Sequence, residues 1–270
     1  MASRTVALLQ ALQAQFEEYT KDQLTAFIVC RNVLVDGVLV PDPRQRVRKD
    51  ASFSFTFDAY VSRGGYKLEH ALKAFSLDVT GLVMLDAGSS TGGFTDCLLK
   101  HGASLVHSVD VGYNQLDWRL RTDRRVKVLE KQNIMTLESL TPQPHAAVCD
   151  LSFRSIAGAA SHILSLCSEG PLVSLVKPQF EVPRNLENFN GIVSDRKVLL
   201  EVMDRVYDLL EEDQVGIHAV AKSPITGHKG NIEFLTLLTT EKGMDRMQFH
   251  QQVSTLISCS SPLQPIPLHP

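Results

Sequence analysis

Leu82-Val-Met-Leu-Asp86-Ala-Gly88-Ser-Ser-Thr-Gly92-Gly93-Phe94 carries the strongest structural signal in the chain. Its apolar start is typical of a buried strand, and the glycine-rich turn that follows opens a helix expected over residues 94–100. Ligands of open α/β sheets bind beyond the carboxyl ends of the strands, and glycine lets the backbone turn tightly and approach a ligand there. We therefore predict a ligand site at this turn. The alternative is that the glycines serve only to pack the helix against the strand.

Short apolar runs alternate with helical patterns through the section around this turn. The strands that we expect are residues 82–85, 105–109, 146–149, 172–176, 215–221 and 233–238. Strands separated by helices predict a parallel sheet with helices on both faces. The fold class expected for residues 60–242 is therefore α/β.

A second acidic residue indicates which ligand the turn binds. Asp110 ends the strand after the glycine turn, roughly 20 residues further on, where a carboxylate can bond ribose hydroxyls. The turn has neither the GxGxxG pattern of dinucleotide sites nor the lysine of a phosphate-binding loop. Asp86 suits an amino group better than a pyrophosphate. These features favour S-adenosylmethionine over NAD or ATP, with a Rossmann-type dehydrogenase as the rival interpretation.

Charged residues also follow other apolar strands. Asp150 and Lys177 each end one, and the carboxyl ends of parallel strands share one edge of a sheet, so both should lie near the glycine turn. Lys67 lies in a polar turn that leads into a helix, and Glu233 starts a late strand. Taken alone, Lys67 and Glu233 would be interpreted as exposed surface charges.

The sections on either side of residues 60–242 have a different character. Residues 1–59 show two short helical patterns, a hairpin over residues 33–40 turning at Asp36-Gly37, and a phenylalanine alternation through Phe57, which predict a small α+β module. Residues 243–270 contain several prolines and predict a short helix and a partly disordered tail.

Composition sets the cellular context that we expect. The five cysteines are odd in number and form no CxxC pair, which favours reduced thiols in a cytoplasmic protein over disulfides or a zinc site. No metal site is therefore expected. The start of the chain has no signal-peptide pattern, and no apolar run reaches the roughly 18 residues of a membrane span. A formal net charge of -3 does not exclude nucleic acid, since a local basic patch suffices.

Together these motifs resemble the TlyA, or haemolysin A, family of FtsJ-like RNA ribose 2′-O-methyltransferases. The matching segments, in family order, are residues 60–69, 85–99, 109–116, 149–153, 175–181 and 223–235. The resemblance implies a Rossmann-like methyltransferase domain with a mostly parallel seven-stranded sheet. It also implies that the N-terminal module is similar to a ribosomal-protein-type RNA-binding domain.

The same resemblance implies the site residues and the substrate. The family's catalytic tetrad falls on Lys67, Asp150, Lys177 and Glu233. The substrate implied is RNA, plausibly cytidine of ribosomal RNA in a ribosomal subunit. The S-adenosylmethionine-binding residues that we predict are Asp86, Gly88, Ser89, Ser90, Thr91, Gly92, Gly93, Phe94, Asp110, Asn133 and Asp150.

Lys177 has two possible roles in this scheme. As a neutral base it would accept the hydroxyl proton, and as a cation it would stabilise the developing alkoxide. Asp150 would orient Lys177, while Lys67 and Glu233 would hold the ribose and the other tetrad members. The sequence leaves the two roles of Lys177 open.

Basic residues outside the tetrad are the candidates for RNA contact. One set is Arg44, Arg46, Arg48, Lys49 and Arg63, and a second is Arg119, Arg121, Arg124 and Arg125. For any single one of the arginines, an ordinary solvated surface is an equally good interpretation. Trp118 and the phenylalanines are expected in the core. Two further functions remain as alternatives, a membrane-active haemolysin and a catalytically inactive RNA-binding relative.

Overall fold

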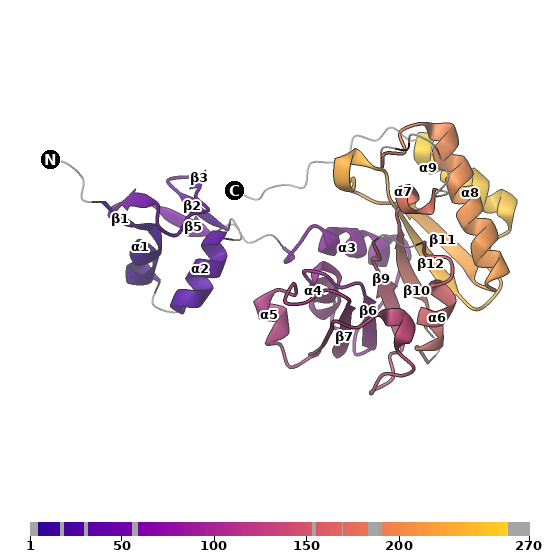
Figure 1. Cartoon of the computed structure of the whole chain (residues 1–270), viewed down its shortest axis with the longest axis horizontal. Coiled ribbons are helices and arrows are strands. Elements are labelled where there is room, and N and C mark those ends of the chain that lie inside the picture. The colour runs from indigo at the N-terminus through magenta and orange to yellow at the C-terminus, as the bar shows by residue number, and fades with distance from the viewer. Residues whose placement is uncertain are drawn as a thin grey trace. The chain divides into compact units, whose positions relative to one another are not determined.

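The computed structural model describes residues 5–16, 19–29, 32–55, 59–152, 155–168, 170–182, 189 and 191–258. The chain divides into two compact units, Met1–Ala59 and Tyr60–Pro270. Each unit is described by itself, with the element labels of Figure 1.

Unit 1 is a small α+β structure. Its helices and hairpin confirm the expected pattern, because Asp36 and Gly37 both adopt positive φ, of 50° and 78°, as a type I′ turn requires. Strand β1 and its antiparallel pairing with β4 were not predicted, and Phe57 lies outside the described residues. The elements are β1 Thr5–Ala7, α1 Leu8–Gln15, α2 Lys21–Val29, β2 Val33–Val35, β3 Val38–Leu39, β4 Arg46–Arg48 and β5 Phe53–Phe55.

Unit 2 is built on a seven-stranded sheet in the order β11-β12-β10-β9-β6-β7-β8. The strands from β10 to β8 are parallel, and β12 lies antiparallel between β10 and β11. The predicted mostly parallel sheet is thus confirmed. Its strands are β6 Val83–Ala87, β7 Leu105–Asp110, β8 Val126–Glu130, β9 Ala146–Cys149, β10 Leu172–Val176, β11 Gly216–Lys222 and β12 Phe234–Thr239.

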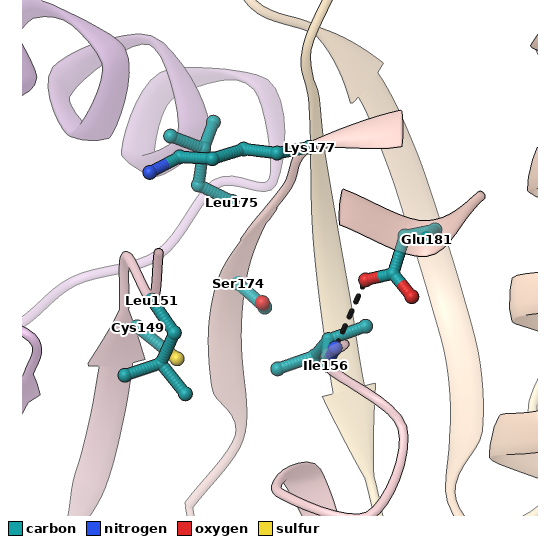
Figure 2. A pocket seen from close by; sticks show the side chains of 7 residues that line it. All are labelled: Cys149, Leu151, Ile156, Ser174, Leu175, Lys177 and Glu181. Atoms are coloured by element: carbon teal, nitrogen blue, oxygen red, sulfur yellow. Dashed lines mark hydrogen bonds between the residues drawn. The ribbon is translucent and has the colours of Figure 1, made fainter. Parts of the chain in front are cut away.

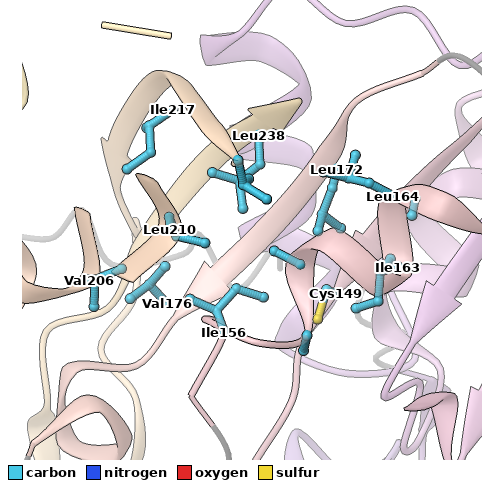
Figure 3. Packing of buried hydrophobic residues seen from close by; sticks show 14 of the residues in the cluster. Cys149, Ile156, Ile163, Leu164, Leu172, Val176, Val206, Leu210, Ile217 and Leu238 are labelled. Carbon is cyan, nitrogen blue, oxygen red and sulfur yellow. The ribbon is translucent and has the colours of Figure 1, made fainter. Parts of the chain in front are cut away.

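Helices cover both faces of this sheet (Figure 1). Alternate strand residues point to opposite faces, so Leu85 packs in one buried cluster with α6, α8 and α9 while Met84 packs in another with α3 and α4. Figure 3 shows Val176 of β10 packed in the first cluster, which also holds Leu210 of α8. The helices are α3 Gly64–Ala74, α4 Gly93–Lys100, α5 Trp118–Arg121, α6 Ala160–Ser165, α7 Pro178–Glu181, α8 Arg196–Glu212 and α9 Arg246–Ser258.

Strand β8 and helices α5, α6, α7 and α8 lie in parts of unit 2 for which no element is predicted from the sequence, and helix α9 packs differently from expectation. Helix α9 had been placed in a separate C-terminal section, but its Phe249 and Val253 are fully buried in the cluster with α8, so it belongs to the domain. Residues 259–270 lie outside the described residues. No helix in the described parts of the chain combines the length and apolar character needed to cross a membrane.

Candidate active site

The glycine turn joins β6 to α4, and contacts inside the protein account for its glycines. Gly92 has a φ of 96°, and a Cβ there would fall 2.3 Å from the Leu120 side chain. At Gly88 a Cβ would lie 2.7 Å from the carbonyl oxygen of Asp150. Packing alone therefore requires glycine at both positions. The close approach at Gly88 also places the turn directly against the residue that follows β9.

Asp86, at the foot of the turn, is a buried carboxylate that is only partly satisfied. Its Oδ2 accepts a hydrogen bond of 2.6 Å from Thr95 Oγ1, whereas its Oδ1 has no hydrogen-bond partner among the described residues. Burial, helped by the nearby charges of Asp150 and Asp110 and opposed by hydrogen bonding from Thr95, raises the pKa of Asp86 to about 7. A cationic amino group would supply the missing partner and favour the carboxylate. Asp86 thus has the chemistry predicted for holding the amino end of S-adenosylmethionine, directly or through a water molecule, although its side chain is fully buried.

Asp110 binds the turn to the end of β7. Its Oδ2 accepts from Ser90 N at 2.8 Å and its Oδ1 from Gly112 N at 2.6 Å. A carboxylate can accept about four hydrogen bonds, so each oxygen keeps capacity for a ribose hydroxyl. Asn133 caps the short 3₁₀ turn after β8 through a hydrogen bond of 3.0 Å from Met135 N. Phe94 differs from the other predicted cofactor residues, because its side chain is buried in the core.

The four predicted catalytic residues form two ion pairs. Lys67 Nζ of α3 lies 2.5 Å from Glu233 Oε2, with both side chains buried. Lys177 Nζ lies 2.5 Å from Asp150 Oδ1 and donates a hydrogen bond of 3.2 Å to Ser152 Oγ. Each lysine in the group is therefore matched by one carboxylate.

Sheet topology explains how these residues meet. Asp150 and Lys177 directly follow the parallel neighbours β9 and β10. Glu233 directly precedes β12, which runs antiparallel to β10 with Phe234 opposite Val176. The start of β12 and the end of β10 therefore lie at the same edge, and this reversal brings Glu233 to the side of the sheet where Asp150 and Lys177 emerge.

The ion pairs line a cleft of about 480 Å³. That volume falls within the range of small-molecule sites and can admit a nucleotide. Lys67, Lys177 and Glu233 line it directly, and Asp150 reaches it through its contact with Lys177. The other lining residues are Arg63, Ser152, Gln179, Phe180, Gly191, Thr226, Gly227, Lys229 and Asn231.

The connection between β11 and β12 encloses Glu233. Ser223 N donates to the Glu233 backbone oxygen at 2.9 Å, and a Cβ on Gly227 would collide with the Glu233 carboxylate. Arg63 Nη2 donates to Thr226 O at 2.9 Å, so this candidate RNA contact also anchors the connection. Gly227 was not singled out as a site residue. The signal was present, because it lies inside a segment that carried the family resemblance.

A further buried carboxylate joins the loop after β9 to helix α7. Glu181 accepts hydrogen bonds from Ser155 Oγ at 2.5 Å and from Ile156 N at 2.9 Å. Burial raises its pKa, in opposition to these hydrogen bonds. Figure 2 shows Glu181 bonded to the Ile156 backbone while Lys177 points away from it. The loop after β9 is therefore held at two places. Lys177 contacts Asp150 and Ser152 near its start, and Glu181 contacts Ser155 and Ile156 near its end.

The candidate RNA contacts of unit 1 are exposed and partly engaged within the protein. Arg44 Nε lies 3.6 Å from Asp42, Arg48 Nη2 lies 3.1 Å from Asp36, and Arg46 Nη2 donates to Thr5 O at 2.6 Å. Lys49 is exposed. Their role in RNA contact stays a prediction.

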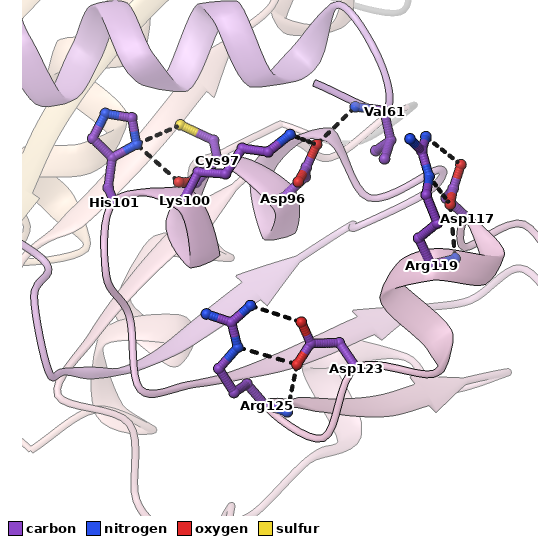
Figure 4. A network of polar contacts seen from close by, with 9 residues as sticks. All are labelled: Val61, Asp96, Cys97, Lys100, His101, Asp117, Arg119, Asp123 and Arg125. Carbon is purple, nitrogen blue, oxygen red and sulfur yellow. Dashed lines mark hydrogen bonds and ion pairs between the residues drawn. The ribbon is translucent and has the colours of Figure 1, made fainter. Parts of the chain in front are cut away.

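The second arginine set surrounds α5, where charges pair with close neighbours. Arg119 forms two side-chain hydrogen bonds to Asp117, and Arg125 forms two to Asp123 (Figure 4). Arg121 Nη2 donates to Glu130 Oε1 at 2.6 Å. The expectation that Trp118 lies in the core is wrong, because 58% of this residue is exposed at the start of α5. It holds for the buried phenylalanines Phe94, Phe234 and Phe249.

Comparisons with known proteins agree with one another. The family model for FtsJ-like methyltransferases matches residues 60–240. The chain is 40% identical over 236 residues to "Putative rRNA methyltransferase YqxC" of Bacillus subtilis, covering 85% of this chain and 83% of that protein. It is 38% identical over 234 residues to the Mycobacterium tuberculosis "16S/23S rRNA (cytidine-2'-O)-methyltransferase TlyA", covering 82% and 85%. The solved structure "Putative hemolysin from Streptococcus thermophilus" superposes with a TM-score of 0.70 at 33% identity, covering 94% and 96%.

Proposed function

The chain belongs to the FtsJ-like methyltransferase family, and from this premise we propose that it transfers a methyl group from S-adenosylmethionine to a ribose 2′-hydroxyl of ribosomal RNA. The observation that carries the proposal is the pair of lysine–carboxylate contacts at a nucleotide-sized cleft, one of which involves Asp150, whose backbone packs against Gly88 of the glycine turn. Family membership gives methyl transfer. The cleft and the rRNA-modifying relatives support the RNA substrate.

Three groups of this chain would hold the methyl donor. S-adenosylmethionine supplies, when bound, a methyl group that is already activated on a sulfonium. The unpartnered oxygen of Asp86 would bind the amino group, and the remaining capacity of Asp110 would bind the ribose hydroxyls. The backbone between Gly88 and Gly93 would lie along the ligand. The protein's contribution on this side is chiefly positioning.

Lys177 would act on the acceptor oxygen as a cation. Its contact of 2.5 Å with Asp150 is an ion pair, whose attraction requires the charged lysine. We therefore favour the stabilising role over the neutral base. Lys177 would offset the negative charge on the acceptor oxygen while the bond from that oxygen to the methyl carbon replaces the methyl's bond to the donor sulfur, which keeps the electron pair, and the hydroxyl proton would leave to solvent in the open cleft. Lys67 and Glu233, held together by their own pair, would fix the ribose.

The relatives narrow the substrate that we propose. The Mycobacterium tuberculosis relative is named for cytidine 2′-hydroxyls of 16S and 23S rRNA. We extend cytidine of ribosomal RNA to this chain, with unit 1 and its exposed Arg46 and Lys49 as an RNA-binding module. Its place of action would be the cytoplasm, where ribosomal RNA is accessible. Phosphate contacts of this kind would weaken as salt rises.

Methylation of purified ribosomal subunits by the full chain tests the proposal. Subunits from a strain lacking the gene are incubated with labelled S-adenosylmethionine, and the nucleosides are identified by mass spectrometry. We expect 2′-O-methylcytidine from the wild type, a loss of about 10²- to 10⁴-fold for Lys177→Ala, and full activity for Lys197→Ala, whose side chain is 87% exposed on α8. Absence of any new ribose-methylated nucleoside with folded wild-type protein would refute the proposal.

A further inference from the structure

The segment after β7 exposes apolar side chains to an unusual degree. Val111, Tyr113 and Trp118 are 70%, 66% and 58% exposed, and they are three of the eight large apolar residues exposed in the described parts of the chain. Trp118 is the single tryptophan of the protein. We call residues 111–118 the aromatic segment. Large apolar side chains exposed together within one short segment mark a candidate interaction site.

The aromatic segment is held firmly in this arrangement. Leu116 and Leu120 are buried against Gly92, and Asp117 N donates to Thr91 O at 3.1 Å. Glu130 accepts hydrogen bonds from Gln115 N and from the Arg121 side chain. The exposed aromatics therefore do not result from a loosely packed loop, because the leucines of the same segment point inward and are well packed.

Positive charge surrounds the exposed aromatics. Residues 113–131 contain six lysines and arginines and three acidic residues, a net charge of +3 in a chain whose total is -3. Lys131, which directly follows β8, has its Nζ 4.1 Å from the centroid of the Tyr113 ring. Aromatic rings beside cations are the usual means by which proteins hold unpaired nucleotides, through stacking and phosphate attraction.

The aromatic segment leaves the same sheet edge as the catalytic residues. It follows β7, and β9, which precedes Asp150, is the second strand along from β7. Two strand spacings amount to about 10 Å. An RNA chain whose target ribose lies in the cleft can therefore reach the aromatic segment with nucleotides close to the target.

We propose that Tyr113 and Trp118 form a stacking surface for unpaired bases of the substrate RNA, with Lys131 attracting an adjacent phosphate. The inference rests on the proposed function, because it assumes an RNA substrate. It adds a contact outside the reaction cleft that would help select where on the RNA the enzyme acts.

The single tryptophan makes this surface directly observable. The full chain is titrated with a single-stranded oligoribonucleotide, and separately with S-adenosylhomocysteine, while the fluorescence of Trp118 is recorded. We expect saturable quenching by the oligoribonucleotide that weakens with added salt. Quenching by S-adenosylhomocysteine alone, with no further change on adding RNA, would assign the surface to the methyl donor and overturn the inference.

Variants separate this contact from catalysis. Trp118→Ala should raise the KM for RNA roughly tenfold with kcat little changed, Trp118→Phe should restore most of the loss, and Met247→Ala, at an exposed apolar residue of α9, should have no effect. Melting temperatures check that each variant is folded. An unchanged KM in Trp118→Ala, with a wild type that methylates RNA, would overturn the inference and leave the proposed function intact. A wild type that methylates no ribose but whose fluorescence is quenched by RNA would refute the function alone.

Discussion

The charged groups of the cleft and those around α5 are paired in opposite ways. Lys67 contacts Glu233 across 166 residues of sequence, and both side chains are buried. Arg119 contacts Asp117, two residues away, and Arg125 likewise contacts Asp123 at the surface. The charges of the cleft meet their partners only when unit 2 is folded, whereas these surface arginines pair with side chains two residues away in the sequence.

The difference decides how much each pair matters. In an exposed pair each charge is solvated by water whether or not its partner is present, so loss of the pair changes the free energy of unfolding little. A buried pair leaves a charge without solvent or counter-charge when one partner is removed, which is strongly unfavourable. Charge placement in the cleft is therefore a condition for folding as well as for chemistry. Each of the following substitutions tests a different degree of burial.

Removal of Lys67 should have the strongest effect on stability. Lys67→Ala leaves the Glu233 carboxylate buried without its partner and should lower the free energy of unfolding by about 3–5 kcal/mol. Lys73→Ala, which removes an exposed pair with Glu69 on the same helix, should cost about 0.5 kcal/mol or less. Urea denaturation measures both.

A double variant sharpens the contrast between the folding and chemical roles of this pair. Lys67→Met combined with Glu233→Leu should recover much of the lost stability, because an apolar pair needs no counter-charge. Methyl transfer should stay abolished. Equal stability of Lys67→Ala and Lys73→Ala would show that the buried pair differs in no important way from the surface pair.

Asp86 tests a buried carboxyl group that has no cationic partner among the residues that the structure describes. Its raised pKa of about 7 means that the folded state retains a proton which the unfolded chain releases near pH 4, so this group lowers stability as pH rises from about 4 to about 7. Asp86→Asn should therefore gain stability relative to the wild type over that window, by up to about 4 kcal/mol. It should also bind S-adenosylmethionine more weakly. Parallel stability–pH profiles of the two proteins would contradict the assignment.

Glu181 tests a buried carboxylate satisfied by hydrogen bonds alone. Glu181→Ala leaves Ser155 Oγ and Ile156 N without their acceptor and should lower stability by about 1–3 kcal/mol. Glu181→Gln keeps one acceptor oxygen and should lose less. If the loop after β9 depends on this contact, kcat should fall in the alanine variant while the affinity for S-adenosylmethionine is kept. A lower affinity for S-adenosylmethionine in Glu181→Ala would instead show that the substitution disturbs binding of the methyl donor.

Arg125 should show the smallest effect. Its hydrogen bonds lower the pKa of the Asp123 carboxyl, yet both side chains are partly exposed to water. Arg125→Ala should therefore change the free energy of unfolding by about 1 kcal/mol or less, and less still in high salt. A loss as large as that of Lys67→Ala, measured by urea denaturation, would remove the distinction between the two regions.

Elements were predicted most accurately from the sequence where residues close together in the chain determine the local structure. Strand β6, the glycine turn and α4 follow one another without interruption, and Asp110 could be placed because it ends the next strand. Helix α8 was missed although Leu199, Met203, Val206 and Leu210 are buried at helical spacing. Strand β8 has only one fully buried side chain at the sheet edge, so its pattern is weak.

Pairing between distant segments could not be predicted from residue patterns. Lys67 and Glu233 were named only through the family resemblance, because nothing local marks either as buried. Trp118 was misplaced for the converse reason. A large apolar residue is usually assigned to a core, but here Leu120 is buried beneath α5 and the tryptophan is exposed.

Because strand β12 runs antiparallel to β10, the candidate site is built from two separate parts of the chain. The residues that we propose for the methyl donor follow β6 and β7, whereas Glu233 and the connection from Ser223 belong to the β11–β12 hairpin, on the other flank of the sheet. Gly227 of that connection packs directly against the Glu233 carboxylate, so we expect changes of length or composition there to disturb the Lys67–Glu233 pair before they affect the ends of β6 and β7.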